Sequence, residues 1–399
     1  MEIKKIAENY KDEIIALRRK LHQYPELSYQ ESRTAGVIKE YLINLGLFVE
    51  DNVGSGGIVA VLEGVSEGPN IGIRADMDAL PIGELNEVDY RSNISNSMHA
   101  CGHDGHMAIV LGTAAIIKEL QSSIKGKVTF IFQPAEEHLP QGGAKGMIEA
   151  RPRYFKELSA ILGIHIWPYF ESGKIMISEK TMMAAGDVFC IKLLGSGGHG
   201  AAPHEATDLV GLTGALINSL NGLTRRMTDV FNPTVISIGQ IEGGKGTNII
   251  PSEITLRGTT RYLNPKLKEV LPKEIERVLR SLTEAYNAEY LFEYFYGYPA
   301  LKNDEKITAY LRECAKEIIG EENILEFNKP SMASEDFAVY LENIPGCYFW
   351  LGTYNSSKEI IYPLHHPKFN IDEEILPIGS AIIARTTIEL LDKLGGEFF

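Results

Sequence analysis

Basic residues, cysteines and long apolar runs are all scarce in this chain of 399 residues. Lys and Arg number 39 against 53 Asp and Glu, which gives a formal net charge of −14. There is therefore no basic surplus to neutralise the phosphates of a nucleic acid or an anionic membrane. The charged amino-terminal segment contains no apolar signal core, and no uninterrupted apolar run reaches about 18 residues. We therefore expect a soluble, cytoplasmic protein that binds neither nucleic acid nor membrane.

The four cysteines are too few and too scattered for a disulfide framework in a chain of this length. Cys190, Cys314 and Cys347 lie in apolar stretches, where a small buried thiol is expected. Cys101 lies instead among histidines, glycines and a carboxylate, so it needs a chemical explanation. A serine hydrolase is not supported, because the chain contains no Gly-x-Ser-x-Gly segment.

The order of the expected elements differs between two parts of the chain. In residues 1–183, helical segments such as 106–120 alternate with short β-rich runs, and this pattern predicts a mixed sheet covered by helices on both faces. Residues 184–297 follow the order strand, helix, strand, strand, helix, strand, which is that of a ferredoxin-like sandwich. We expect an α/β fold in which a mixed-sheet α/β/α catalytic domain, residues 1–183 and 298–399, is interrupted by an inserted ferredoxin-like (βαββαβ) lid domain. The expected strands of the first part are 58–62, 71–75, 128–132 and 160–165.

The segment from His99 to His106 places a thiol, three imidazoles and a carboxylate within eight positions. Cys101 and His103, separated by one glycine, can face the same ion, and sulfur and nitrogen donors suit zinc, cobalt, nickel or manganese. A polar helix N-terminus capped by Asp104 is the structural alternative, but a cap does not require three histidines. A cysteine hydrolase with Cys101 as nucleophile is a further alternative. It leaves the remaining clustered side chains without roles.

Several acidic residues and histidines fall where regular elements are predicted to begin or end. In open α/β sheets, ligands bind outside the carboxyl ends of the strands, so we expect these side chains to converge. Adjacent carboxylates diverge in direction, so one of a pair can bind metal while the other faces the substrate as a base. The residues concerned are Asp76, Asp78, Glu136, Glu137, His165, His365 and His366.

Residues 195–200 match the G-x-G-x-x-G pattern of dinucleotide-binding proteins. That pattern requires a helix to begin within the turn, whereas Pro203 and His204 follow it and the helical spacing begins near Asp208. We therefore reject nucleotide binding. A flexible glycine loop that presents His199 and His204 is predicted instead.

The motifs together resemble the di-metal amidohydrolases of the aminoacylase/carboxypeptidase superfamily. The most similar branch contains hippurate hydrolases, N-acyl-amino-acid amidohydrolases, thermostable carboxypeptidases and plant auxin-conjugate hydrolases. The resemblance extends from the segment 17–22 to the segment 364–367, nearly the whole chain. The matching segments are Arg-Ala-Asp-Met-Asp-Ala-Leu-Pro at 74–81, His-Ala-Cys-Gly-His-Asp at 99–104, Gln-Pro-Ala-Glu-Glu at 133–137 and the loop that contains His199.

The resemblance implies two divalent metal ions per subunit, which are Zn, Mn, Co or Ni. Glu136 matches the general base of the family, and Asp76 is a second predicted catalytic residue. His199, Asn248 and Arg261 match lid residues that hold the reacting carbonyl or the substrate carboxylate. The implied metal ligands are Cys101 as the bridging thiolate, His103, Glu137, His165 and His365, with His366 in a position that the family usually fills with Asn or Ser.

The activity implied by the resemblance is metal-dependent hydrolysis of the amide bond of small N-acyl amino acids or short C-terminal peptides. The lid is implied to form a homodimer, with a dimer of dimers as the larger assembly, and its histidine can reach the partner's active site. An N-acetyldiaminopimelate deacetylase is the alternative within the branch. A catalytically idle, metal-loaded binding protein is the alternative outside it, but that reading predicts a missing base or ligand, and none is missing.

Overall fold

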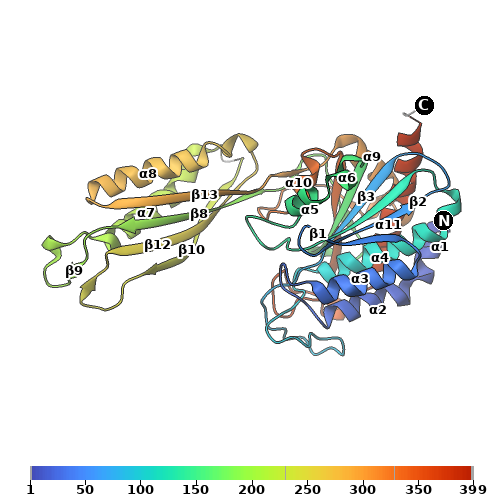
Figure 1. The fold of residues 1–399 in the computed structure, drawn as a ribbon, viewed down its shortest axis with the longest axis horizontal. Helices are drawn as coiled ribbons and strands as arrows, with labels where there is room; N and C mark the ends of the chain where they lie inside the picture. The colour runs from blue at the N-terminus through green and yellow to red at the C-terminus, as the bar shows by residue number, and fades with distance from the viewer. Residues whose placement is uncertain (1, 230, 328, 397–399) are drawn as a thin grey trace.

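The computed structural model describes residues 2–229, 231–327 and 329–396, and these form two units of different architecture (Figure 1). The larger unit contains both termini and is built on an eight-stranded mixed sheet. The smaller unit projects from it and makes the molecule elongated. The predicted α/β fold with a large mixed sheet is confirmed.

The large sheet has the strand order β1-β2-β4-β3-β5-β16-β6-β15. Its central strands β4, β3, β5 and β16 are parallel, whereas the pairs β1–β2, β2–β4 and β16–β6 are antiparallel. All residues of β3 are buried, as expected for a strand that is covered on both faces. The strands are β1 (Phe48–Val53), β2 (Gly57–Glu63), β3 (Asn70–Asp76), β4 (Lys127–Gln133), β5 (Ala160–Glu171), β6 (Ile175–Met176), β15 (Ile324–Leu325) and β16 (Gly346–Tyr354).

Helices cover both faces of the large sheet and enclose a separate apolar core on each. The first core is built with α1 (Glu2–Asn9), α2 (Lys11–His22), α3 (Ser32–Asn44), α4 (His103–Glu119), α9 (Glu305–Ile319) and α11 (Ile375–Gly395). The second core contains α5 (Ala144–Ala150), α6 (Pro152–Lys156) and α10 (Phe337–Leu341). Among the described helices, none combines the length and the apolar character needed to span a bilayer.

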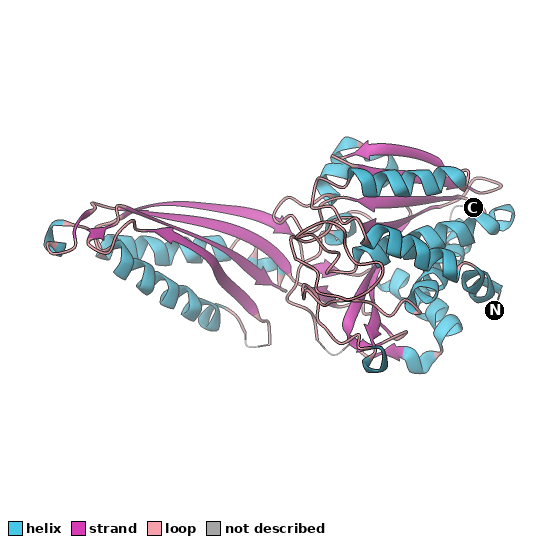
Figure 2. Ribbon diagram, turned by 90° about the horizontal axis from the view of Figure 1, so that it is seen from below, coloured by secondary structure: helices cyan, strands magenta, loops and turns pink. Residues whose placement is uncertain are grey.

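The smaller unit has the βαββαβ order that the sequence predicts for residues 184–297. Its antiparallel sheet has the order β10-β12-β8-β13, and α7 and α8 cover one face of this sheet around a core of their own (Figure 2). This strand order is that of a ferredoxin-like sandwich. The exact domain boundaries stay a prediction. The elements are β8 (Ala185–Leu194), α7 (Leu209–Met227), β10 (Thr234–Gly243), β12 (Glu253–Tyr262), α8 (Leu271–Ala285) and β13 (Glu289–Tyr298).

Short strand pairs lie at the two ends of the smaller unit. At the junction with the larger unit, β7 (Thr181–Met183) pairs with β14 (Leu301–Lys302), so the chain leaves and returns side by side. At the far end, β9 (Gly198–His199) pairs with β11 (Ile249–Ile250) (Figure 1). The glycine loop therefore forms a strand and not the start of a helix, because α7 begins only at Leu209. The loop therefore lacks the helix that the dinucleotide-binding pattern requires within the turn.

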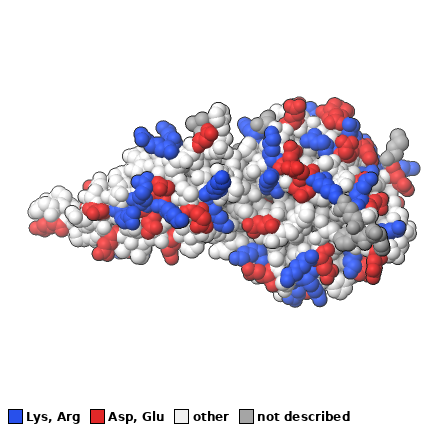
Figure 3. Space-filling model, turned by 90° about the horizontal axis from the view of Figure 1, so that it is seen from above, with Lys and Arg blue, Asp and Glu red and all other residues white. Residues whose placement is uncertain are grey.

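Charged side chains of both signs are interspersed on the face of the molecule shown in Figure 3, over both units. On this face, acidic side chains are not gathered in one patch.

Candidate active site

One cavity of about 170 Å³ collects side chains that lie far apart in the sequence. Its wall includes Cys101, Glu136, Glu137, His165 and His365. These residues come from the segment just before α4, the turn after β4, the strand β5 and the loop before α11. The cavity thus lies near the carboxyl ends of β3 and β4, where open α/β sheets bind their ligands.

The five predicted metal ligands form two groups of three donors, and Cys101 belongs to both. The ligand atoms of Cys101, His103 and His165 lie within 4.8 Å of one another, and so do those of Cys101, Glu137 and His365. We name these the first triad and the second triad. A thiolate shared by two triads of nitrogen, sulfur and oxygen donors is suited to a pair of transition-metal ions.

The two histidines of the first triad are oriented by backbone carbonyls. His103 Nδ1 lies 2.8 Å from the carbonyl oxygen of Asp78, and His165 Nδ1 lies 2.7 Å from that of Ile166. A carbonyl oxygen can only accept, so each Nδ1 carries a proton and each Nε2 is the ring nitrogen left to face a cation. His165 Nε2 lies 3.5 Å from Cys101 Sγ, and the buried His103 Nε2 has no hydrogen-bond partner among the described residues. Both nitrogens are thus available to a cation.

The second triad depends on a strained loop residue. His365 has φ +63°, and its backbone N–H donates to the Ala100 carbonyl at 2.8 Å, which holds the loop beside the first triad. His365 Nε2 lies 3.2 Å from Glu137 Oε1, yet Glu137 Oε1 makes no hydrogen bond among the described residues. His366 instead stacks on Tyr362, with ring centroids 4.6 Å apart. Of the two adjacent histidines, His365 is therefore the one that faces the other donors.

The electrostatics of the cavity also fit bound cations. Burial raises the pKa of Glu136 well above its usual range, and the carboxylates of Glu335 and Glu137 add to the effect. Burial likewise raises the pKa of the Cys101 thiol, again with help from Glu137 and Glu136. Without cations, the site therefore resists accumulating negative charge. Divalent ions would offset this repulsion and favour the thiolate and carboxylate forms that act as ligands.

Glu136 lies in a turn that is held by three side chains from other segments. Asp78 accepts the backbone N–H of Glu136 at 3.0 Å and that of the following residue at 3.0 Å. Glu31 accepts the N–H of Ala135, which has φ +56°, at 2.8 Å. The Tyr298 hydroxyl, at the end of β13, donates to the Glu136 carbonyl at 2.7 Å. The backbone under this carboxylate is therefore well fixed.

Asp76 lies behind the ligands and does not line the cavity. Its Oδ1 is 2.7 Å from His106 Nδ1, and its Oδ2 accepts Arg74 Nη1 at 2.8 Å. The fully buried Arg74 also donates to Asp336 at 2.7 Å, and His106 Nε2 accepts the backbone N–H of Ile166 at 2.8 Å. Asp76 thus orients neighbours of the triads. A direct catalytic role for it stays a prediction.

Helix α4 begins differently from the sequence prediction. It starts at His103 and not near His106, and its cap is Gly102, at φ +89°, without a side-chain hydrogen bond. The alternative with Asp104 as the cap is therefore wrong. The Asp104 carboxylate is turned into a buried cluster on α2, where it accepts Arg18 Nε at 2.6 Å.

His165 does not end its strand, because β5 continues to Glu171. The pairing of β3 with β5 stops at Arg74 and Gly163, so β5 extends beyond its neighbour. The expectation that every candidate residue lies at an element end is therefore wrong for His165. It reaches the cavity from within a strand, at the point where the neighbouring strand has stopped.

The smaller unit contributes Arg261, on β12, to the cavity. Arg261 Nη1 donates to Ser334 Oγ at 2.5 Å, and burial lowers the pKa of the guanidinium. His199 and Asn248 lie instead at the far end of the smaller unit, where the Gly200 N–H donates to the Asn248 carbonyl at 2.8 Å (Figure 1). Within one chain, Arg261 alone of the three predicted lid residues reaches the cavity.

Sequence reasoning did not assign roles to Glu31, Tyr298 or Ser334. Each acts on a residue that is distant in the sequence, so local spacing contains no sign of its role. Asp78 follows a predicted strand in the sequence, and this position is the one local sign of its role.

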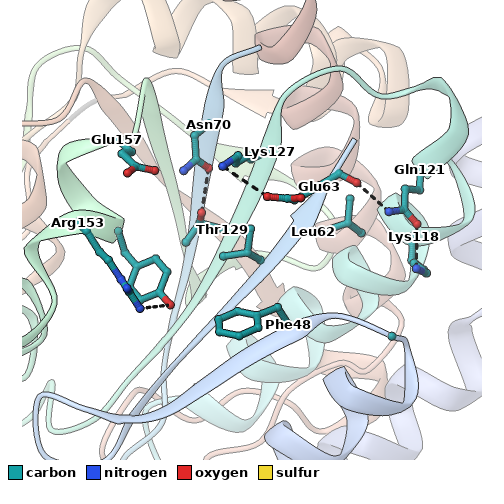
Figure 4. A pocket seen from close by; sticks show the side chains of 13 residues that line it. Phe48, Leu62, Glu63, Asn70, Lys118, Gln121, Lys127, Thr129, Arg153 and Glu157 are labelled. Atoms are coloured by element: carbon teal, nitrogen blue, oxygen red, sulfur yellow. Dashed lines mark hydrogen bonds and ion pairs between the residues drawn. The ribbon is translucent and has the colours of Figure 1, made fainter. Parts of the chain in front are cut away.

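A second hollow, of about 480 Å³, is lined by residues of the four neighbouring strands β1, β2, β4 and β3 (Figure 4). Its cations Lys118, Lys127 and Arg153 are each bound to a neighbouring side chain, as the dashed lines show. Its three cations therefore all have partners, whereas His103 Nε2 and Glu137 Oε1 at the first cavity have no hydrogen-bond partner among the described residues.

Comparison with known proteins agrees with the geometry of the cavity. A sequence model of peptidase family M20/M25/M40 matches residues 72–389. Thermostable carboxypeptidase 1 of Saccharolobus solfataricus is 36% identical over 394 residues, 98% of this chain and 99% of its own length. The N-acyl-L-amino acid amidohydrolase of Geobacillus stearothermophilus is 40% identical over 305 residues, 76% of this chain and 82% of its own length.

The fold comparison leads to the same family. The crystal structure of a dinuclear metal-binding peptidase of the M20 family from Bacillus subtilis superposes with a TM-score of 0.80 at 32% identity, covering 96% of this chain and 99% of the other. The match extends over both units of the molecule. The chain therefore belongs to peptidase family M20/M25/M40, and it is a hydrolase.

Proposed function

We propose that this protein hydrolyses the amide bond of N-acyl amino acids, or of short peptides at their C-terminal residue, with the help of two divalent metal ions. The observation that carries the proposal is the thiol shared by two donor triads, with the Glu136 carboxylate in the same cavity. The named activities of the carboxypeptidase and amidohydrolase relatives support it.

The two triads are the proposed metal ligands. Cys101, His103 and His165 would hold one ion, and Cys101, Glu137 and His365 would hold the other. Thiolate and imidazole donors favour Zn, Co or Ni, and the carboxylate also admits Mn. Bound divalent ions supply Lewis acidity toward the substrate carbonyl and the attacking water.

Glu136 is the proposed general base. Its carboxylate takes a proton from the attacking water while the water oxygen forms a bond to the amide carbon. As the carbon–nitrogen bond breaks, the same carboxyl group returns that proton to the leaving amine. The Glu136 N–H donates to Asp78 and the Glu136 carbonyl accepts from Tyr298, and these two bonds fix the backbone, so the carboxylate needs little rearrangement between the two proton transfers.

Arg261 is the proposed anchor for the substrate carboxylate. Its guanidinium is bound to a neutral hydroxyl, and no ion pair joins it to a carboxylate among the residues that the structure describes. A guanidinium can hold a carboxylate through two parallel N–H groups. This contact would favour substrates with a free α-carboxylate over their amides.

A panel of N-acetyl amino acids, hippurate, N-acetyldiaminopimelate and carbobenzoxy-amino acids tests the function through the amine released. We expect hydrolysis of N-acyl amino acids that stops after chelation and returns when Zn, Mn, Co or Ni is added back. Selective hydrolysis of N-acetyldiaminopimelate would identify the alternative deacetylase. Metal-loaded protein that hydrolyses none of these substrates would identify the idle binding protein, and activity after complete metal removal would contradict the metal mechanism.

A reducing compartment suits the proposed thiolate ligand. The four cysteines are all free thiols, and Cys101 is buried in the cavity. Oxidation would remove the lone pair that the metal needs. We therefore propose that the protein acts in the cytoplasm.

We further propose a homodimer in which His199 of one subunit completes the cavity of its partner. This proposal is supported by the position of His199, which lies at the far end of the smaller unit together with Asn248. Strand β10 also forms an open edge of the small sheet, where a second copy can pair. In the partner's cavity, the imidazole would donate to the developing oxyanion.

Mixing two inactive variants tests this shared site. Glu136→Gln and His199→Ala are each expected to lose most activity, because each dimer then lacks either the base or the oxyanion donor at both cavities. After subunit exchange, a mixed dimer contains one cavity with both groups, so activity should recover to about a quarter of the wild-type value. Two unmixed samples serve as controls. Absence of recovery, despite subunit exchange measured by mass, would contradict the proposal.

A further inference from the structure

We propose that Ser334 and Gly186 position the guanidinium of Arg261, so that Ser334 sets the preference of the enzyme for a free substrate carboxylate. The inference rests on the proposed role of Arg261 as the carboxylate anchor. Ser334 is a positioning residue in this proposal, because it acts on the substrate only through Arg261.

The first observation is a hydrogen bond across the two units. Arg261 belongs to β12 of the smaller unit, and Ser334 lies just before α10 of the larger unit. Arg261 Nη1 donates to Ser334 Oγ at 2.5 Å, and both side chains line the cavity beside Glu136. A hydroxyl orients a guanidinium without neutralising it. The positive charge therefore remains available to an anionic ligand.

The second observation is the close approach of the guanidinium to Gly186. The two residues are direct partners in the pairing of β12 with β8, so the side chain of Arg261 lies across the Gly186 backbone. A Cβ atom on Gly186 would lie 2.0 Å from Arg261 Nη1 and 2.7 Å from Ser334 Oγ. Both distances are shorter than a Cβ atom tolerates. Glycine is thus required for this position of the guanidinium.

Together, the two contacts leave a defined part of the guanidinium free. A guanidinium has five N–H groups in a rigid planar fork, and Ser334 uses one of them, on Nη1. The others remain for a carboxylate, which binds best through two parallel N–H groups. Without Ser334, the side chain of Arg261 becomes ordered only when the substrate binds. The conformational entropy lost in this step weakens binding and raises KM.

The experiment compares an N-acetyl amino acid with its amide. Ser334→Ala should raise KM for the acid by about fivefold to tenfold, which is within the range of one typical hydrogen bond, with kcat within about twofold. KM for the amide should stay unchanged. Ser334→Thr, which keeps the hydroxyl, should restore the wild-type KM, and Gly186→Ala should repeat the effect of Ser334→Ala. Ser281→Ala, on the exposed face of α8, is the matched control and should behave as wild type, because among the described residues the Ser281 hydroxyl bonds only to a carbonyl of its own helix.

Arg261→Ala separates this inference from the function on which it rests. If this variant raises KM equally for the acid and the amide, Arg261 is not a carboxylate anchor and the proposed carboxylate selectivity fails. If it affects the acid alone while Ser334→Ala affects both substrates alike, only the positioning role is refuted. In the Arg261→Ala background, Ser334→Ala should have no further effect. A further rise of KM there would show that Ser334 acts independently, and would overturn the inference.

Discussion

Glu136→Gln should lower kcat by about 10²- to 10⁴-fold while the protein keeps its bound metal. Glutamine preserves the size of the side chain and leaves the backbone contacts with Asp78 and Tyr298 in place, but it cannot take up the proton of the attacking water. Steady-state kinetics and metal analysis of the purified variant measure the two effects.

The adjacent carboxylate provides the matched control. Glu137 is a member of the second triad, so Glu137→Gln should lower the bound metal as well as the activity. The comparison separates a base from a ligand at neighbouring positions. A Glu136→Gln variant with near-normal kcat would remove Glu136 from the role of base.

Cys101→Ala should lose both metal ions and the activity that depends on them, whereas His165→Ala should lose chiefly one ion. Cys101 Sγ belongs to both triads, while His165 belongs only to the first. Elemental analysis after dialysis measures the number of metal ions per chain in each variant and so tests this difference directly.

A thiol outside the cavity controls for the loss of a cysteine as such. Cys190 lies on β8 of the smaller unit, so Cys190→Ala should retain the full metal content. Full metal occupancy in Cys101→Ala would show that the thiol is not a shared ligand. Equal losses in Cys101→Ala and His165→Ala would show that the two sites load only together, and would also contradict a separate first triad.

The central strands could be predicted from the sequence because their burial is nearly complete. β3 and β4 are covered on both faces, so their residues form nearly continuous apolar runs with clear ends. The order β4-β3-β5-β16 could not be predicted in the same way. It depends on pairing between strands that are separated by the whole smaller unit, as in β5 and β16, and such pairing leaves no local pattern.

The candidate ligands stand out in the sequence because their side-chain chemistry is rare and concentrated. Three histidines and a thiol within eight positions are informative by themselves. The residues that position them are chemically ordinary. Tyr298 and Glu136 are 162 positions apart, and Glu31 and Ala135 are 104 apart. Only the tertiary structure brings these pairs together.

The two predicted aspartates illustrate the same limit. Asp76 is the last residue of β3 and turns toward Arg74, while Asp78 lies beyond the strand and holds the turn of Glu136. Residues two apart share a face only within a regular strand. Because β3 ends between them, the two similar side chains point in different directions and bind different partners.

Because the smaller unit is inserted before His365, the residues of the two triads are completed at different times during synthesis. Every member of the first triad precedes β8, whereas His365 of the second triad follows β13 and β16. During synthesis the chain emerges from its amino terminus, so the first three donors exist long before the last one. A nascent chain can therefore present one complete set of donors while the second set still awaits its final histidine.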